Sequence, residues 1–287
     1  MQLSHEDAVR KFRTALTAYR APDTVDLRCY YVQRIINWTE AQDMTVWDLD
    51  LQDFLTWLSS DVGPSPWTKR SAKSSISVFY QWAHATELIH ENPAQKLPSL
   101  RAPQSFPNPA PEDKVEQALS RCTRRIDVLM ILLGEYQGLR AGEMAPLHSA
   151  DVYGEELRVV GKGNKYRMLP LHPLVSDTLR LFPTGYYFPS TRNPRGHMLA
   201  ASVGRRVRWL FGNQPRINAH SLRHKFAMDA YEENPDLLAL KEALGHESVA
   251  TTEIYARAST KKIRKLVHAL PEKESRRTAL TSLSKAA

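Results

Sequence analysis

Pro93-Ala-Gln-Lys-Leu-Pro-Ser-Leu-Arg-Ala-Pro-Gln-Ser-Phe-Pro-Asn-Pro-Ala-Pro111 is the stretch of sequence that divides the chain. Each proline removes a backbone donor and fixes φ, so neither a helix nor a central strand can run through the stretch. Proline-rich segments of this kind act as semi-rigid spacers. We therefore predict an interdomain linker over residues 93–111, with a folded domain on each side.

Residues 1–92, before the linker, have the periodicity of a helical domain. Leu27, Tyr31, Ile35 and Trp38 recur at spacings of four, four and three residues, which is typical of one buried face of a helix. We therefore predict a small helical bundle over residues 1–92, with these four side chains turned toward its core.

The last long helix of this bundle is predicted to begin at Ser65-Pro66, because serine is a favourable N-cap and proline suits the first turn. Its inward apolar stripe comprises Ala72, Ile76, Phe79 and Ala83. A flanking face of the same helix carries the basic residues Lys69, Arg70 and Lys73. Taken alone, so short a group of charges indicates a solvated surface.

Beyond the linker, the sequence mixes helices with a short pair of strands. Helices are predicted at residues 112–122 and 126–137, and the segment from His172 onward is mostly helical in pattern. The predicted fold is therefore mainly α, with a small β-sheet or hairpin in the C-terminal domain.

The predicted hairpin joins two short strands. Glu156-Leu-Arg-Val-Val160 and Lys165-Tyr-Arg-Met-Leu169 flank the turn Gly161-Lys-Gly-Asn164, which places Lys162 at the tip. A phosphate-binding P-loop is disfavoured here, because the turn lacks the four-residue spacer, the Ser/Thr after lysine and a following helix.

Composition restricts the classes of function. The chain has 287 residues, 39 Lys+Arg against 31 Asp+Glu and a net charge of +8, which favours a polyanionic partner.

Its longest apolar run, residues 128–133, is far shorter than the roughly 20 residues that cross a membrane. The polar, acidic N-terminus does not resemble a signal peptide, so we expect a cytoplasmic protein. Cys29 and Cys122 are far apart, so neither a disulfide framework nor a thiolate zinc site is indicated.

Three short clusters hold the residues that could carry chemistry. They are Gly138-Leu-Arg-Ala-Gly-Glu143, His220-Ser-Leu-Arg-His224 and Leu244-Gly-His-Glu-Ser-Val-Ala-Thr-Thr-Glu-Ile-Tyr255. His220 and His224, four residues apart, could form a metal pair. That interpretation is disfavoured, because no glutamate lies between them as in HExxH, and Arg223 would repel a cation.

Together with Lys162, the clusters include two guanidinium groups, the two imidazoles of His220 and His246, an ammonium group and a phenol. Arginine makes bidentate hydrogen bonds to phosphate oxygens and stays charged at every working pH. A phenol, with a pKa of about 10, becomes a nucleophile when a base or neighbouring cations draw off its proton. The set is suited to acting on a phosphodiester without a metal ion.

These motifs resemble those of the tyrosine recombinases of the phage integrase family, over nearly the whole chain. GLRAGE is similar to the first arginine box of that family, GKGNKYRMLPL to its lysine hairpin and HSLRH to its His-x-x-Arg box. LGHESVATTEIY is similar to the segment that carries the second histidine and the nucleophilic tyrosine. The order and spacing of the four motifs make the resemblance specific.

The resemblance implies a chemical role for each matching residue. The roles are binding of the scissile phosphate by Arg140 and Arg223, general-acid catalysis by Lys162, proton transfer and hydrogen bonding by His220 and His246, and nucleophilic attack by Tyr255. Attack would form a 3′-phosphotyrosyl bond and free a 5′-hydroxyl, and the reverse step would rejoin DNA. Because bond energy is conserved, no cofactor and no metal are expected. Glu143 is expected to support the site without reacting.

The resemblance also implies how the chain is organised. A helical, SAM-like core-DNA-binding domain over residues 1–92 and a catalytic domain over residues 112–258 would close as a clamp around double-stranded core sites. Residues 259–287 are predicted to form a basic tail with an apolar helical stripe. This stripe would dock on its own domain or, as the resemblance favours, on a neighbouring protomer in a homotetramer. Helical pattern begins near residue 6, so we expect the simple two-domain form without an arm-binding domain.

The partners expected from the resemblance are DNA, further copies of the chain and, in some systems, a directionality factor, with no membrane. The candidates for DNA contact are Lys69, Arg70 and Lys73 in the first domain and Arg205, Arg206 and Arg208 in the second.

Several biological roles are compatible with the same residues. Integration and excision of phage or mobile-element DNA is the main hypothesis, and Xer-like resolution of chromosomes uses the same motifs. A type IB topoisomerase-like nicking enzyme shares the chemistry, but the exchangeable tail argues against it. An inactive DNA-binding regulator is disfavoured, because every reactive position is filled.

Overall fold

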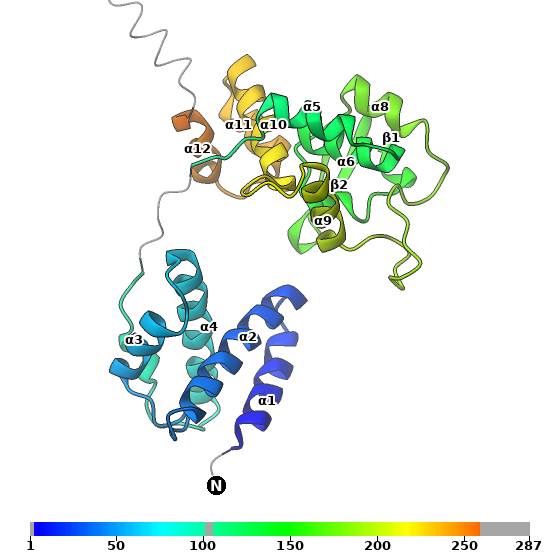
Figure 1. Cartoon of the computed structure of the whole chain (residues 1–287). Helices are drawn as coiled ribbons and strands as arrows, with labels where there is room; N and C mark the ends of the chain where they lie inside the picture. Colours follow the sequence, from blue (N-terminus) through cyan, green and yellow to red (C-terminus); the bar gives the residue numbers. More distant parts are fainter. Residues whose placement is uncertain (1–2, 101–105, 259–287) are drawn as a thin grey trace, which may run out of the picture. The chain divides into compact units, whose positions relative to one another are not determined.

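The computed structural model describes residues 3–100 and 106–258 (Figure 1). The chain divides after Gln104 into two compact units, and each is described by itself. The predicted fold class is confirmed, because both units are mostly helical and a small antiparallel sheet lies in the second. The predicted exchanged helix of residues 259–287 lies outside the described residues. Within the described ranges, no helix is both long and apolar enough to cross a bilayer.

The first unit is a helical bundle. Its helices are α1 (His5–Thr17), α2 (Pro22–Glu40), α3 (Leu51–Ser60) and α4 (Pro66–Ala85), followed by the short 3-10 helix η1 (Pro93–Lys96). α2 packs against both α1 and α4, and the core includes the buried rings of Phe12, Trp57 and Phe79. The predicted start of α4 is confirmed: Ser65 is the N-cap and accepts a hydrogen bond from the backbone N–H of Thr68.

The prediction for the buried face of α2 is wrong in part. Tyr31 and Ile35 are buried, and the partly buried Trp38 packs against the core, but Leu27 is 47% exposed. Because α2 contacts two helices, it buries a wide face centred near Val32, and Leu27 lies beyond the edge of that face. The spacing of four apolar residues identified one row of this face but not its centre.

Each end of the predicted linker packs on the unit beside it. Ala94 and Leu97 are buried in the core of the first unit, and η1 lies against α3 and α4. In the second unit, Ala110 is buried and its N–H donates to the carbonyl of Ser221 at 3.0 Å. The amide of Asn108 donates to the carbonyl of Arg216 at 2.6 Å.

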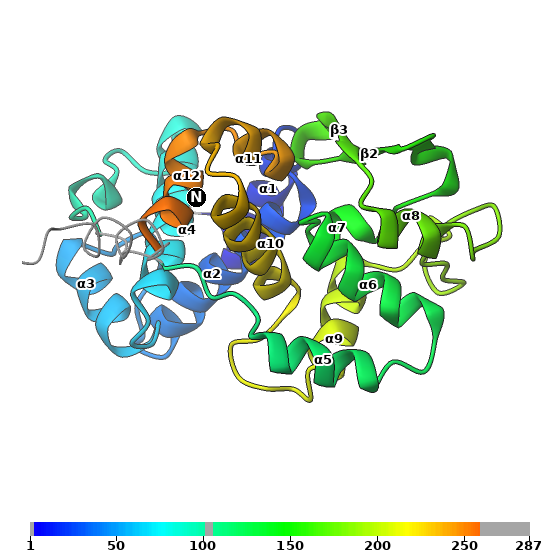
Figure 2. The ribbon, with the colours of Figure 1, turned by 90° about the horizontal axis from the view of Figure 1, so that it is seen from above.

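The second unit is built around α6. Its helices are α5 (Glu112–Ser120), α6 (Arg125–Tyr136), α7 (Ala141–Met144), α8 (Pro173–Leu179), α9 (Ala200–Leu210), α10 (Ala219–Glu233), α11 (Leu237–Leu244) and α12 (Val249–Ala258). α6 is apolar on nearly all sides and packs against α5, α8, α9 and α10 (Figure 2). α10 in turn contacts α11 and α12, which carry the last of the three sequence clusters.

The predicted hairpin is present, and the sheet has one more strand than predicted. β2 (Glu156–Val160) pairs antiparallel with β3 (Tyr166–Pro170), and the two-residue strand β1 (Val152–Tyr153) pairs with β2. Leu157 and Leu169 are paired and point into the core, as the alternating pattern requires. The 3-10 helix η3 (Lys162–Asn164) forms the tip, so the backbone of Lys162 lies where the sequence places it.

α9 is held to α6 by a buried ion pair. The carboxylate of Asp127 is 0% exposed and accepts two hydrogen bonds from Arg206, at 2.7 and 2.6 Å. Arg206 also lies over the ring of Trp209, with its guanidinium carbon 4.2 Å from the ring centroid. Arg206 was a candidate for DNA contact, but its guanidinium is engaged inside the unit. Its contacts are those of a residue that fixes α9.

Replacing Arg206 tests this structural role. Arg206→Ala leaves the Asp127 carboxylate buried with only the longer contacts from Arg124, so the free energy of unfolding should fall by about 2 kcal/mol or more. Arg205→Ala, on the exposed side of the same helix, is the matched control and should change it by less than about 0.5 kcal/mol. Urea unfolding followed by circular dichroism measures both. Equal stability of the two variants would contradict the assignment.

Candidate catalytic site

Arg140 is placed by a turn that only glycine allows. Gly138 has a φ of +61°, and a Cβ there would lie 2.5 Å from the ring of Phe226, so the chain passes close against α10. Arg140 is the N-cap of α7, and its N–H donates to Glu143 Oε2 at 2.9 Å. Its Nη1 donates to Glu143 Oε1 at 2.9 Å, and 40% of the side chain remains exposed. Arg140 is therefore anchored at one edge and open to solvent at the other.

Arg223, on α10, is fully buried beside Arg140. Its Nη1 and Nη2 donate to the carbonyls of Gly138 and Leu244 at 2.7 and 2.6 Å, but its buried Nε has no hydrogen-bond partner among the described residues. Burial, followed by the charge of Arg140, lowers the pKa of Arg223 to about 10, so the group remains a cation at neutral pH. A buried donor without a partner is costly, and an anion could satisfy it.

Glu143 is the carboxylate shared by three arginines. Besides Arg140, it accepts from Arg167 Nη1 and Nη2 at 3.0 and 3.2 Å and lies 3.6 Å from Arg223 Nη1. Burial opposes ionisation of Glu143, but the hydrogen bond and charge of Arg167 outweigh it and lower its pKa. The cluster therefore has three positive charges against one negative charge.

The C-terminus of α11 completes this cluster. The carbonyl of Ala243 accepts from Arg167 Nε at 2.8 Å, and that of Leu244 accepts from Arg223 and, at 3.5 Å, from Arg140. The last carbonyls of a helix carry partial negative charge, so they favour nearby cations. Gly245 ends the helix with a φ of +62°, and a Cβ there would lie 2.9 Å from Arg167 Nη1.

The two predicted histidines lie at the ends of neighbouring helices. His220 is exposed in the first turn of α10, and desolvation followed by the charges of Arg223 and Arg140 lowers its pKa. His246 follows Gly245, and its Nδ1 lies 2.9 Å from the hydroxyl of the fully buried Thr252. Burial and the nearby arginines lower the pKa of His246 to about 4, so its ring is neutral at physiological pH.

Tyr255, on α12, is 1% exposed. Its ring packs in the apolar cluster with Ala227, Leu240 and Leu244, and its hydroxyl lies 3.0 Å from His224 Nδ1. Burial raises the pKa of Tyr255 against the opposing charges of Arg223 and Arg140. The phenol is therefore protonated at neutral pH, although it lies in the field of two guanidinium groups.

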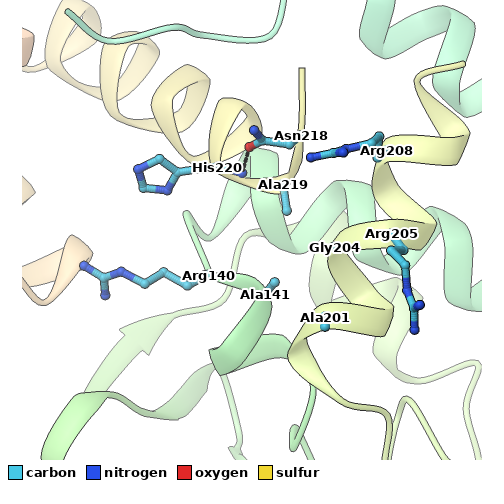
Figure 3. A pocket seen from close by; sticks show the side chains of 9 residues that line it. All are labelled: Arg140, Ala141, Ala201, Gly204, Arg205, Arg208, Asn218, Ala219 and His220. Atoms are coloured by element: carbon cyan, nitrogen blue, oxygen red, sulfur yellow. Dashed lines mark hydrogen bonds between the residues drawn. The ribbon is translucent and has the colours of Figure 1, made fainter. Parts of the chain in front are cut away.

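A cavity of about 420 Å³ opens beside Arg140 and His220. In Figure 3 these two side chains extend in the same direction from α7 and α10, and the rest of the lining includes the small residues Ala141, Ala201, Gly204 and Ala219. Arg208 reaches from α9 toward Asn218, whereas Arg205 points away from Arg140 (Figure 3). The cavity thus carries cations on two of its walls and no carboxylate among its lining residues.

The structure brings most of the predicted site residues together. Arg140, His220, Arg223, His246 and Tyr255 converge from α7, α10 and the α11–α12 segment. Lys162 lies on the hairpin, and its side chain is outside the described part of the structure. In the first unit, Lys69, Arg70 and Lys73 lie on α4, with Arg70 exposed and both lysines partly buried.

Sequence reasoning missed three residues that contact the site: Arg167, Thr252 and His224. Arg167 and Thr252 lie inside quoted motifs, and period-2 alternation on β3 puts Arg167 on the inward side with Leu169. His224 was considered only as a metal ligand. Among the residues that the structure describes, no group of three or more His, Cys, Asp or Glu could hold a metal ion.

Several known proteins are similar to this chain in sequence. The phage integrase family matches residues 111–262. The tyrosine recombinase XerA of Thermococcus kodakarensis is 28% identical, covering 90% of this chain and 93% of that protein. The tyrosine recombinase XerC of Chromohalobacter salexigens is 27% identical, with coverage of 87% and 90%.

Solved structures share the fold. The recombinase XerH in a post-cleavage complex with palindromic difH is 18% identical, with a TM-score of 0.71 and coverage of 94% of this chain and 85% of that one. The lambda integrase tetramer bound to a Holliday junction is 17% identical, with a TM-score of 0.69 and coverage of 88% and 77%.

The buried carboxylate makes stability depend on pH in a defined direction. Folding lowers the pKa of Glu143, so the ionised carboxylate stabilises the folded state. This stabilisation is complete above the ordinary pKa of 4.5 and is lost as the pH falls through the lowered pKa. Glu143→Gln should cost about 3 kcal/mol at pH 7, since it leaves the arginines without a countercharge. From about pH 5 to pH 3, the free energy of unfolding measured with urea should fall less in Glu143→Gln than in the wild type. Parallel pH profiles would contradict this role.

Proposed function

The chain belongs to the phage integrase family of tyrosine recombinases, and from that membership we propose that it recombines DNA at specific sites through a 3′-phosphotyrosyl intermediate. The observation that carries the proposal is the excess of guanidinium groups over carboxylates beside the cavity. A phosphodiester supplies the missing negative charge. Its non-bridging oxygens also suit the exposed edge of Arg140 and the unpartnered Nε of Arg223.

Cleavage starts with the phosphate bound by Arg140 and Arg223. Preorganised charges of this kind stabilise the transition state, and removal of one donor typically costs about 3 to 4 kcal/mol. His220 and His246 add hydrogen bonds to phosphate and assist proton transfer. Because Nδ1 of His246 faces Thr252, its Nε2 is the nitrogen left for the phosphate.

Tyr255 then attacks phosphorus, the bond from its oxygen to phosphorus forms, and the bond from phosphorus to the 5′ oxygen breaks. Lys162 on the hairpin protonates the leaving 5′ oxygen. Because Tyr255 is 1% exposed, the groups that cover its hydroxyl have to move before the phosphate can reach it. Attack by a 5′-hydroxyl from the partner strand reverses these steps and rejoins DNA, so the reaction needs no energy source.

DNA contacts extend away from the reacting phosphate. Arg208 and Arg205 line the cavity and would bind neighbouring backbone phosphates of DNA. In the first unit, the DNA backbone would be bound by Lys69, Arg70 and Lys73. Arg206 is left out of this set because it binds Asp127. Four protomers would assemble on two core sites, with residues 259–287 exchanged between neighbours, in the cytoplasm where the DNA lies.

The biological setting has two candidates. Integration and excision of phage or mobile-element DNA, with a directionality factor, is the first. Xer-type resolution is the second, and it is favoured by the names of the relatives that match about nine-tenths of the chain. Recombination between sites on two separate plasmids supports the first, whereas a strict preference for two sites on one plasmid supports the second.

The nucleophile is tested with one substitution. Tyr255→Phe should bind core-site DNA normally but form no covalent complex with a suicide substrate, because the ring is kept and the hydroxyl is lost. The wild type should give a protein–DNA band that resists denaturation, without added metal or nucleotide. Adduct formation by Tyr255→Phe would overturn the assignment.

The general acid is tested with a modified leaving group. Lys162→Ala should slow cleavage of normal DNA by about 100-fold or more. It should slow cleavage far less when the 5′ leaving atom is sulfur, because a thiolate departs without protonation. Single-turnover rates on the two substrates measure this difference. Equal slowing on both would show that Lys162 is not the acid.

A further inference from the structure

His224 contacts the hydroxyl that reacts. It lies one turn after His220 on α10, and the ring centroids of the two histidines are 4.4 Å apart. Its Nδ1 lies 3.0 Å from Tyr255 Oη. His220, the histidine that the motif assigns to proton transfer, has no such hydrogen bond to Tyr255 among the described contacts. The residue in reach of the phenol proton is therefore His224.

The charge state of the pair fixes the direction of this hydrogen bond. Burial, followed by His220 and Arg223, lowers the pKa of His224 to about 4, and burial raises the pKa of Tyr255. Both groups are then neutral, and a neutral imidazole has one nitrogen free to accept. Within the described residues, His224 Nδ1 is the partner of the buried hydroxyl. The phenol must donate to it, because otherwise a buried O–H would lack an acceptor.

We propose that His224 is a further catalytic residue, the general base that takes the proton of Tyr255 as the nucleophile attacks. The inference rests on the proposed function, which makes Tyr255 the nucleophile. As the bond from Oη to phosphorus forms and the bond from phosphorus to the 5′ oxygen breaks, the proton passes from Oη to His224 Nδ1. Lys162 supplies a separate proton to the 5′ oxygen. In the rejoining step His224 returns its proton to Tyr255.

The surroundings of His224 suit this cycle. The groups that face it are His220 and Arg223 from its own helix and Tyr255 from α12. The acidic groups near this helix on α5 and α6, Glu112 and Glu135, lie against Lys225 instead. In the absence of substrate, burial, followed by the charges of His220 and Arg223, keeps His224 unprotonated. A bound phosphate, whose negative charge grows toward the transition state, offsets those cations and favours the imidazolium when it forms.

Two substitutions separate proton transfer from positioning. His224→Asn places a side-chain amide near the position of Nδ1 and can still accept a hydrogen bond, but it cannot take up a proton. His224→Phe removes both capacities and keeps a ring of similar shape. Circular dichroism and binding to core-site DNA check that each full-length variant is folded and binds its substrate.

The test is the single-turnover rate of adduct formation on a suicide substrate from about pH 6 to pH 9.5. Both variants should be slower than the wild type by about 100-fold or more at pH 7. Their rates should rise about tenfold per pH unit, because hydroxide must now remove the phenol proton, while the wild-type rate stays nearly level. This slope is a readout that a structural role would not change.

Other outcomes overturn the proposal. A wild-type rate in His224→Asn would leave His224 a positioning residue, and faster cleavage in His224→Phe would make it a latch on Tyr255. Slow variants with the level pH profile of the wild type would also refute proton transfer. Failure of the proposed function is distinguishable from all of these, because the wild type itself would then form no adduct.

Discussion

The ion pairs between Glu143 and three arginines hold together the elements that form the site of the second unit. Arg140 comes from α7, Arg167 from β3 and Arg223 from α10, and the same guanidinium groups bind the last carbonyls of α11. One buried carboxylate therefore fixes the positions of the hairpin, the arginines proposed to bind phosphate and the segment that leads to Tyr255. Because one negative charge faces three positive ones, the same cluster that organises the fold remains short of negative charge. Structural support and the proposed phosphate binding therefore have a single physical origin.

The site also contains two pairs of a neutral imidazole and a buried hydroxyl. His246 faces Thr252 and His224 faces Tyr255, and burial with nearby cations lowers the pKa of both rings to about 4. Both hydroxyls lie on α12, so these contacts place that helix against α10 and the end of α11. The hydrogen bonds also decide which ring nitrogen is free. They connect the helical packing directly to the proposed proton transfer.

The sequence predicted which elements and residues form the site better than it predicted the contacts between them. The four motifs specified the elements that meet at the site, since each motif couples a local turn or cap to a functional side chain. Arg167 was missed because period-2 alternation shows only that it points inward, whereas its importance comes from Glu143 far away in sequence. Arg206 was grouped with its exposed neighbours, because charge runs do not reveal that Asp127 is fully buried across the unit. Leu27 was misplaced because apolar spacing does not tell how many helices pack on one face.

The most direct measurement is the mass of the peptide that carries DNA after cleavage. A suicide substrate is reacted with the full chain, nuclease trims the attached strand, and trypsin releases the peptide between Lys241 and Arg257. We expect a nucleotide joined through its 3′ phosphate to Tyr255, the tyrosine of that peptide. A nucleotide on another residue, or a verified core site that is bound but leaves every peptide unmodified, would contradict the account.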